Sequence, residues 1–211
     1  APQLHKGTGS EQIVEAAISG LSANARLILC GLYGEDPKIL SQLVDIAGRH
    51  NEVVGIDLAG GPLKSHKWKL KDYVEPFKKA TRLSLGRTVH AGEGRSAMEI
   101  YQAIVFLNAQ RIGHGTTLLD NRMVLNTIKD RNVCIEACPT SNLHTGVIEQ
   151  VSDHPIKTWI KEGVKVAICA DNTYLSDVTT LKEINRVKSA CNLSSEDIKW
   201  CLESAQQFRF D

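Results

Sequence analysis

Short β-branched runs that alternate with helix-like segments constrain the fold of this chain more than any other feature. Six runs recur, each bounded by glycine, proline or polar residues, over residues 26–30, 53–58, 87–90, 111–114, 133–137 and 166–170. Helix start signals lie between them, such as Asp36 before Pro37 and Ser194 three residues ahead of Asp197. Because parallel neighbours cannot be joined by tight turns, the alternation predicts parallel strands linked by helical crossovers.

Polar side chains stand at or just beyond the ends of these apolar runs. They are Asp57, His90, His114, Glu136 and Asp171. In a closed (β/α)8 barrel this rim carries the chemistry. An open doubly wound sheet also binds ligands at strand ends, but no Gly-x-Gly-x-x-Gly follows any run, and nearly every run ends on a polar residue, so the pattern favours the barrel.

The number of apolar runs indicates how much of a complete barrel this chain contains. A complete barrel has eight strand-helix units and about 250 residues. This chain has 211 residues and six runs. We therefore expect one barrel domain over residues 1–211 with about six of the eight units, in which the first unit and most of the second are missing at the N-terminus.

The composition indicates which kinds of partner and which cellular compartment are expected. The formal net charge is +1, from 25 basic and 24 acidic residues, without a long block of either sign, which argues against nucleic acid and membrane surfaces as partners. The six cysteines have no paired spacing, and this favours a reducing, intracellular compartment. We expect a cytoplasmic protein that acts on a small molecule.

Three strand ends carry reactive side chains. His90 is followed three residues later by Glu93, His114 lies between two glycines, and Asp171 precedes Asn172. Each has a plain structural explanation by itself, since an Asp after a strand is often only a helix cap. Their joint occurrence on one rim indicates metal binding together with acid-base chemistry.

The order of five short motifs resembles the adenosine deaminase family. The motifs are Asp57-Leu58-Ala59-Gly60, His90-Ala91-Gly92-Glu93, Gly113-His114-Gly115, Cys138-Pro139-Thr140-Ser141-Asn142 and Ala170-Asp171-Asn172. The resemblance covers essentially the whole chain. It implies a (β/α)8 TIM barrel of the metal-dependent hydrolase type with one Zn²⁺ ion at the rim, which hydrolyses adenosine and 2'-deoxyadenosine to inosine and deoxyinosine plus ammonia.

The resemblance also implies roles for individual residues. His90 would be a zinc ligand, and Asp171 would bind the same ion and hydrogen-bond the attacking water, whose pKa zinc lowers towards about 7. His114 would either accept the proton of that water or hold the hydroxide aimed at purine C6. Protonated Glu93 would donate to purine N1.

Substrate contacts follow from two further positions. Gly60 would offer its backbone N–H to purine N3. Asn172 would donate to purine N7, where many family members use a protonated Asp. We assign the segment 138–146 a structural role and no catalytic residue.

The chain departs from the family pattern in its metal ligands. The family supplies two more from a His-x-His on the first strand, and no two histidines of this chain are two residues apart. His90 and Asp171 alone fall short of the three protein ligands of a catalytic zinc site. The alternatives are the same chemistry on adenine, aminodeoxyfutalosine or N6-methyl-AMP, an inactive fragment, and a purine-binding barrel without catalysis.

The other histidines and the tryptophans receive structural interpretations. His50 is expected at a helix end, His66 in a lysine-rich loop, and His144 and His154 in polar connections. Trp68, Trp159 and Trp200 are expected at helical positions, as packing residues and not as a platform on which a base stacks.

Overall fold

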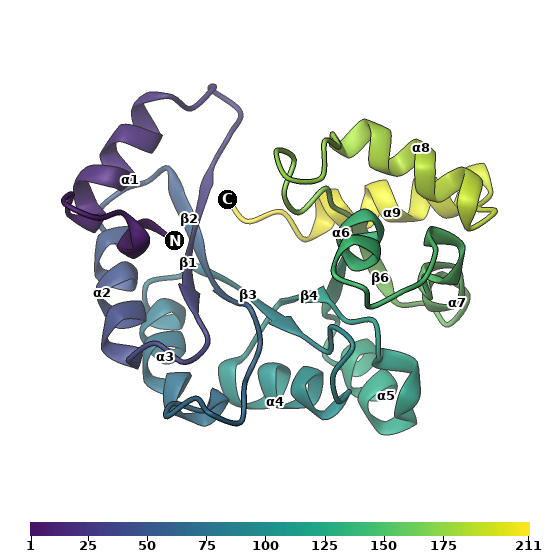
Figure 1. Cartoon of the computed structure of the whole chain (residues 1–211), viewed down its shortest axis with the longest axis horizontal. Helices are drawn as coiled ribbons and strands as arrows, with labels where there is room; N and C mark the ends of the chain where they lie inside the picture. The colour runs from purple at the N-terminus through teal and green to yellow at the C-terminus, as the bar shows by residue number, and fades with distance from the viewer. The chain divides into compact units, whose positions relative to one another are not determined.

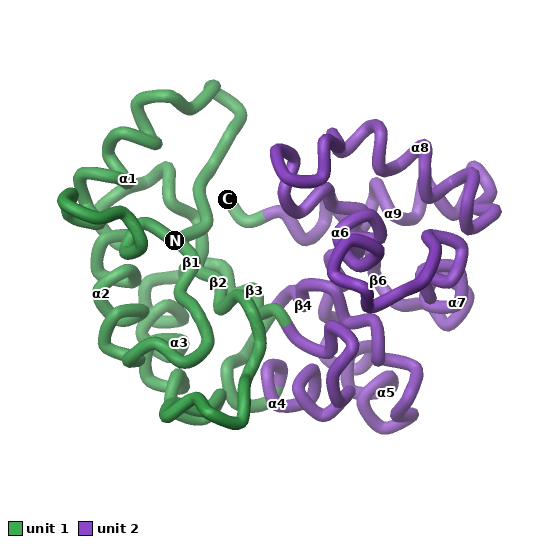
Figure 2. Tube along the Cα trace, viewed as in Figure 1, with its two compact units in different colours: residues 1–90, 105–109, 210–211 green, residues 91–104, 110–209 purple.

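The computed structural model describes residues 1–211, which divide into two structural units (Figure 2). The first unit comprises residues 1–90, 105–109 and 210–211, and the second comprises residues 91–104 and 110–209. A single domain over residues 1–211 stays a prediction.

Parallel strands form the sheet of the first unit. In chain order they are β1 (Leu27–Leu32), β2 (Val53–Ala59) and β3 (Gly86–Ala91). The helices of this unit are η1 (Pro2–Leu4), α1 (Ser10–Ser19), α2 (Pro37–Ala47), η2 (Leu70–Tyr73) and α3 (Val74–Arg82). Helix α2 packs against β1, β2 and α3 (Figure 1).

Local sequence explains these elements. Strand β2 is buried along its length except at its last residue, as expected of a parallel strand that is covered on both faces. At the start of α2 the Asp36 carboxylate accepts a hydrogen bond of 3.0 Å from the backbone N–H of Lys38, and Pro37 opens the first turn. The predicted start of this helix is confirmed.

The second unit also contains parallel strands joined through helices. Its strands are β4 (Arg111–His114), β5 (Cys134–Ala137) and β6 (Lys165–Ile168). Its helices are α4 (Met98–Leu107, whose last turn belongs to the first unit), η3 (Leu118–Asp120), α5 (Arg122–Asp130), α6 (Pro139–His144), η4 (Val151–Asp153), α7 (Ile156–Lys161), α8 (Thr180–Ala190) and α9 (Ser195–Gln207).

The last helix shows how the second unit is held together. Ser194 and Asp197 form a reciprocal capping box at the start of α9, and α9 packs against β6. Trp159 is fully buried, and the indole N–H of Trp200 donates to the backbone carbonyl of Val164 at 2.9 Å. Both tryptophans therefore serve packing, as predicted.

Each of the six predicted runs contains a strand, and each strand pairs in parallel with a neighbour. Strand β6 ends at Ile168, two residues before the end of the predicted run. Strand β1 continues two residues beyond the predicted run, because Gly31 and Leu32 pair with Leu58 and Ala59 of β2. No helix of the structure combines the length and the apolar character that a membrane crossing requires.

Candidate active site

The second unit brings two predicted site residues, His114 and Glu93, together with a third residue, Asn142. The Nδ1 atom of His114 lies 3.0 Å from Nδ2 of Asn142 and 3.6 Å from Oε1 of Glu93. Nδ2 of Asn142 lies 3.5 Å from the same Glu93 oxygen. His114 and Asn142 are buried, with exposed fractions of 3% and 0%. These three side chains form an acid-base cluster.

The backbone of this cluster is shaped by a turn after β3. Gly92 has φ +66°, and a Cβ atom there would lie 2.7 Å from the end of the Ile100 side chain, so any other residue would be strained and crowded at this position. Its carbonyl accepts hydrogen bonds from the hydroxyls of Thr116 and Thr117 at 2.9 and 3.1 Å. The turn that precedes Glu93 is thereby tied to the end of β4.

Two predicted catalytic residues adopt left-handed backbone conformations. His114 has φ +67° and Asp171 has φ +56°. Residues other than glycine rarely adopt such angles, although Asn, Asp and His do so more readily than most. Such conformations are concentrated at active sites. Here His114 is the last residue of β4, and Asp171 lies three residues beyond the end of β6.

Asp171 and Asn172 are held by different donors. The hydroxyl of Ser141 donates to Oδ2 of Asp171 at 2.6 Å. The side-chain oxygen of Asn172 accepts from the backbone N–H of Leu175 at 2.9 Å. Because this bond occupies the oxygen, the side-chain NH2 of Asn172 is the group that can donate to a ligand.

Helix α6 contributes contacts that the sequence interpretation missed. Thr140, Ser141 and Asn142 are consecutive, and each reaches a different partner. Thr140 donates through its backbone N–H, at 2.7 Å, and through its hydroxyl to the fully buried carboxylate of Glu183 on α8. The signal that could have revealed a site role was the run of three polar residues that begins three positions after the end of β5.

The first unit holds His90, Asp57 and Gly60. Nδ1 of His90 lies 3.1 Å from both carboxylate oxygens of Asp57, which is 8% exposed. A carboxylate on one ring nitrogen is the usual support of a metal-binding histidine, and it presents Nε2 as the ligand atom. Gly60 has φ +74°, and no atom lies within 4 Å of the place where its Cβ would be.

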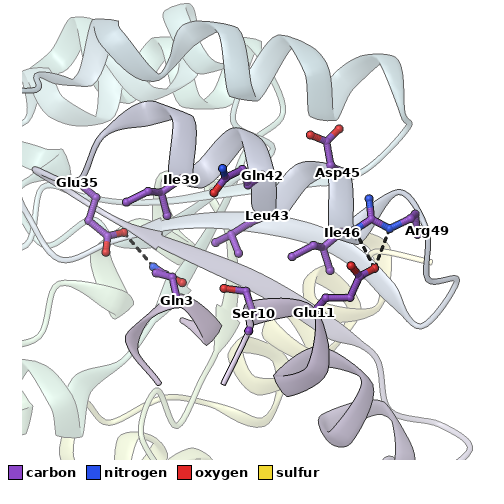
Figure 3. Close-up of a pocket in the computed structure, with 11 residues that line it drawn as sticks. Gln3, Ser10, Glu11, Glu35, Ile39, Gln42, Leu43, Asp45, Ile46 and Arg49 are labelled. Atoms are coloured by element: carbon purple, nitrogen blue, oxygen red, sulfur yellow. Dashed lines mark hydrogen bonds and ion pairs between the residues drawn. The ribbon is translucent and has the colours of Figure 1, made fainter. Parts of the chain in front are cut away.

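The first unit also has a cavity of about 550 Å³ beside α1 and α2 (Figure 3). Glu11 and Arg49 form an ion pair of 2.7 Å at its wall, and Gln3 donates to Glu35 at 2.9 Å. None of the predicted site residues lines it. The cavity is therefore separate from the strand-end residues of this unit.

Comparison with known proteins decides the family. The adenosine deaminase family model matches residues 8–207. The chain belongs to the adenosine deaminase family.

Curated family members from bacteria resemble the chain over nearly all of its length. An adenosine deaminase of Clostridium botulinum (strain Kyoto / Type A2) is 34% identical, and the match covers 94% of this chain and 62% of that protein. An adenosine deaminase of Vibrio atlanticus is 32% identical, with 97% and 65% covered. The chain thus spans less than two thirds of the length of these relatives.

Solved structures confirm the predicted fold class, a (β/α) barrel of which part is present. An adenine deaminase from Arthrobacter aurescens has a TM-score of 0.90 at 20% identity, covering 100% of this chain and 66% of that one. An N6-methyl-AMP deaminase from Arabidopsis thaliana has a TM-score of 0.83 at 23% identity, covering 97% and 64%.

His90 and Asp171 are the candidate metal ligands of this chain. A solved amidohydrolase from Burkholderia ambifaria contains bound zinc, and it has a TM-score of 0.79 at 21% identity, covering 93% of this chain and 55% of that one. In the present chain no three His, Cys, Asp or Glu side chains gather as a metal site. His90 and Asp171 have suitable donor atoms, but they do not make a complete zinc site by themselves.

His154 differs from its expected place in a polar connection, because it is buried with 3% exposed. Its Nδ1 accepts a hydrogen bond of 3.2 Å from the backbone N–H of Ile156, and its ring meets that of Trp159 edge-on at 5.0 Å. Burial lowers the pKa of His154 from 6.5 to about 3. The surrounding core keeps this imidazole neutral.

Proposed function

We propose that the protein containing this chain hydrolyses adenosine and 2'-deoxyadenosine to inosine and deoxyinosine plus ammonia. The observation that carries the proposal is the acid-base cluster of Glu93, His114 and Asn142. Membership of the adenosine deaminase family and the 34% identity to a bacterial adenosine deaminase support it.

The cluster offers the two functions that purine deamination needs. Protonated Glu93 donates its proton to purine N1, which makes C6 electrophilic. His114 acts on the water, whose oxygen bonds to C6, and the C6–N6 bond then breaks. One proton of the water passes to the leaving NH2, which departs as ammonia, and the other returns to Glu93, while the proton that Glu93 gave stays on N1 of the product. General acid-base catalysis of this kind contributes on the order of 10²- to 10⁴-fold to the rate.

His90 and Asp171 are the residues of this chain that we propose as zinc ligands. When bound, zinc would supply a water of lowered pKa. Two hydrogen bonds support the proposal, since such partners orient ligands and tune their basicity. The carboxylate of Asp57 accepts one from Nδ1 of His90, and the hydroxyl of Ser141 donates one to Asp171.

Two residues are proposed to hold the base. Open space at Gly60 leaves room for a purine against the backbone N–H, and the fixed oxygen of Asn172 leaves its NH2 to donate to N7. We further propose a cytoplasmic location and a small-molecule substrate rather than a nucleic acid or a membrane, supported by six free thiols and a net charge of +1.

The test is zinc content and turnover of the full-length gene product, followed at the purine absorbance band, with adenosine, 2'-deoxyadenosine, adenine, aminodeoxyfutalosine and N6-methyl-AMP. We expect about one zinc ion per chain and the highest kcat/KM for the two nucleosides. Glu93→Gln should lower kcat by about 100-fold or more, since an amide cannot transfer the acid proton. Glu203→Gln is the control, because Glu203 is exposed on α9.

Other results of this experiment would change the substrate or reject the proposed activity. A preference for adenine, aminodeoxyfutalosine or N6-methyl-AMP would keep the chemistry and replace the substrate. Absence of both zinc and turnover would reject the enzyme, and binding of adenosine without turnover would then favour a purine-binding barrel.

A further inference from the structure

Asn142 occupies the centre of the acid-base cluster without a role in the proposed chemistry. Its side chain is fully buried, and its amide nitrogen lies within 3.5 Å of both His114 Nδ1 and Glu93 Oε1. Its backbone N–H donates to the carbonyl of Cys138 at 2.9 Å, and its carbonyl accepts from the N–H of Val147 at 2.9 Å. The amide is therefore fixed relative to both reactive groups.

The hydrogen-bond chemistry of this contact assigns a proton on His114. An amide nitrogen only donates, and a neutral imidazole has one N–H and one bare nitrogen. Because Nδ1 faces the amide nitrogen of Asn142 at 3.0 Å, Nδ1 is the bare nitrogen, and the hydrogen is on Nε2.

The amide orientation is supported by the cost of reversing it. At present the buried side-chain oxygen of Asn142 has no hydrogen-bond partner. If the amide were reversed, the NH2 group would take the place of this oxygen, and its two N–H donors would be buried without acceptors. Buried donors without partners are rarer in proteins and cost more free energy than a buried carbonyl oxygen without a partner.

A matching assignment follows for Glu93. Its Oε1 atom receives the Asn142 amide at 3.5 Å and the hydroxyl of Thr145 at 3.4 Å. Both groups donate to Oε1, whereas the guanidinium of Arg95 lies 4.0 Å from Oε2, beyond hydrogen-bond distance. Oε1 is therefore the oxygen of the carboxyl group that accepts hydrogen bonds. In a protonated Glu93 the acid proton therefore belongs on Oε2.

We propose that Asn142 is a positioning residue that selects the Nε2–H tautomer of His114 and places the acid proton of Glu93 on Oε2. The sequence left two roles open for His114, to accept a proton from the attacking water or to hold the hydroxide. In this tautomer Nε2 already has a hydrogen, so it can donate a hydrogen bond to the attacking oxygen but cannot accept a proton from it. The consequence for catalysis rests on the proposed function, whereas the tautomer does not.

The test is ring-nitrogen NMR of the full-length protein labelled with ¹⁵N-histidine, with the His114 signals assigned from His114→Gln. We expect His114 as the Nε2–H tautomer. His154 is an internal reference, because its Nδ1 accepts from Ile156 and so has the same tautomer without any contact to Asn142. An Nδ1–H tautomer at His114 would overturn the proposal.

Asn142→Asp separates positioning from packing, since it changes the group and hardly the volume. A carboxylate only accepts, so we expect His114 to switch to Nδ1–H and kcat to fall by on the order of 100-fold, with KM changed less. Asn132→Asp, at an exposed turn, should leave the tautomer and kcat as they are. An unchanged tautomer in Asn142→Asp refutes the proposal, whereas the expected tautomers in a protein that deaminates none of the purines refute only the proposed function.

Discussion

The hydroxyl of Ser141 donates a hydrogen bond of 2.6 Å to Oδ2 of Asp171, across a sequence separation of 30 residues. Ser141 lies in the first turn of α6, and Asp171 follows β6 with φ +56°. A short bond to a charged acceptor is among the stronger hydrogen bonds. It fixes the rotation of a carboxylate whose backbone is already strained.

Removal of the Ser141 hydroxyl should therefore loosen Asp171. We expect Ser141→Ala to lower zinc affinity and kcat/KM for adenosine each by about 10- to 100-fold, the range for lost partners of metal ligands. Competition with a chelating dye and steady-state kinetics measure the two effects. Ser141→Thr keeps the hydroxyl and should stay near the wild type, and an equal loss in both variants would show that packing is responsible.

Gly60 and Gly163 can be compared directly, because a substitution to alanine should strain the backbone equally at the two positions. Gly60 and Gly163 have φ +74° and +78°, and neither has an atom within 4 Å of its Cβ position. Alanine at either position should lower the free energy of unfolding by about 1–2 kcal/mol, the cost of a left-handed residue. Only Gly60→Ala should raise KM for adenosine, because the added methyl enters the space proposed for the base. Equal KM values in the two variants would remove Gly60 from the substrate site.

Glu183 should matter for stability. Its carboxylate is fully buried and accepts two hydrogen bonds from Thr140. We expect Glu183→Ala to lower the free energy of unfolding by about 3 kcal/mol, since it leaves buried donors without an acceptor. Urea denaturation measures the change. Glu203→Ala removes an exposed carboxylate 3.8 Å from Lys199 and should cost less than about 0.5 kcal/mol; a similar cost for both would contradict the bracing role of Glu183.

His154 should make stability depend on pH. Its pKa is about 3 in the folded chain and 6.5 as an unperturbed side chain, so the unfolded state binds the proton more readily. Its stabilising effect is complete above pH 6.5 and is lost as the pH falls towards 3, at up to about 1.4 kcal/mol per pH unit.

The matched variant is His154→Asn, which keeps an acceptor for the N–H of Ile156 and does not titrate. Between pH 7 and pH 5 the wild type should lose about 2 kcal/mol more of its free energy of unfolding than this variant. Urea titrations at both pH values measure the difference, and parallel losses would show that His154 is protonated while folded.

The strands were predictable because burial on both faces leaves a local signature. Val53 to Leu58 is apolar apart from Gly55 and Asp57, and all of it lies in β2, as expected. The caps Asp36 and Ser194 were equally local. The extension of β1 to Leu32 was not predictable, since it depends on pairing with Ala59, 27 positions later.

The proximity of two candidate site residues was also predictable from the sequence. Strand ends indicated His114 and Glu93, and the structure brings them to 3.6 Å. The roles of Ser141 and Asn142 were missed, because their direction depends on how α6 is anchored by Glu183, 43 residues after Thr140. The burial of His154 likewise depends on the Trp159 ring and not on its polar neighbours in sequence.

The three consecutive contacts of α6 make the length of the β5–α6 connection as important as its residues. Successive residues on a helix are separated by about 100°. One residue inserted between Ala137 and Thr140 would turn Thr140, Ser141 and Asn142 away from Glu183, Asp171 and His114 together. Single substitutions remove these contacts one at a time, whereas an insertion or deletion removes them all, so this connection should vary in residue type but not in length.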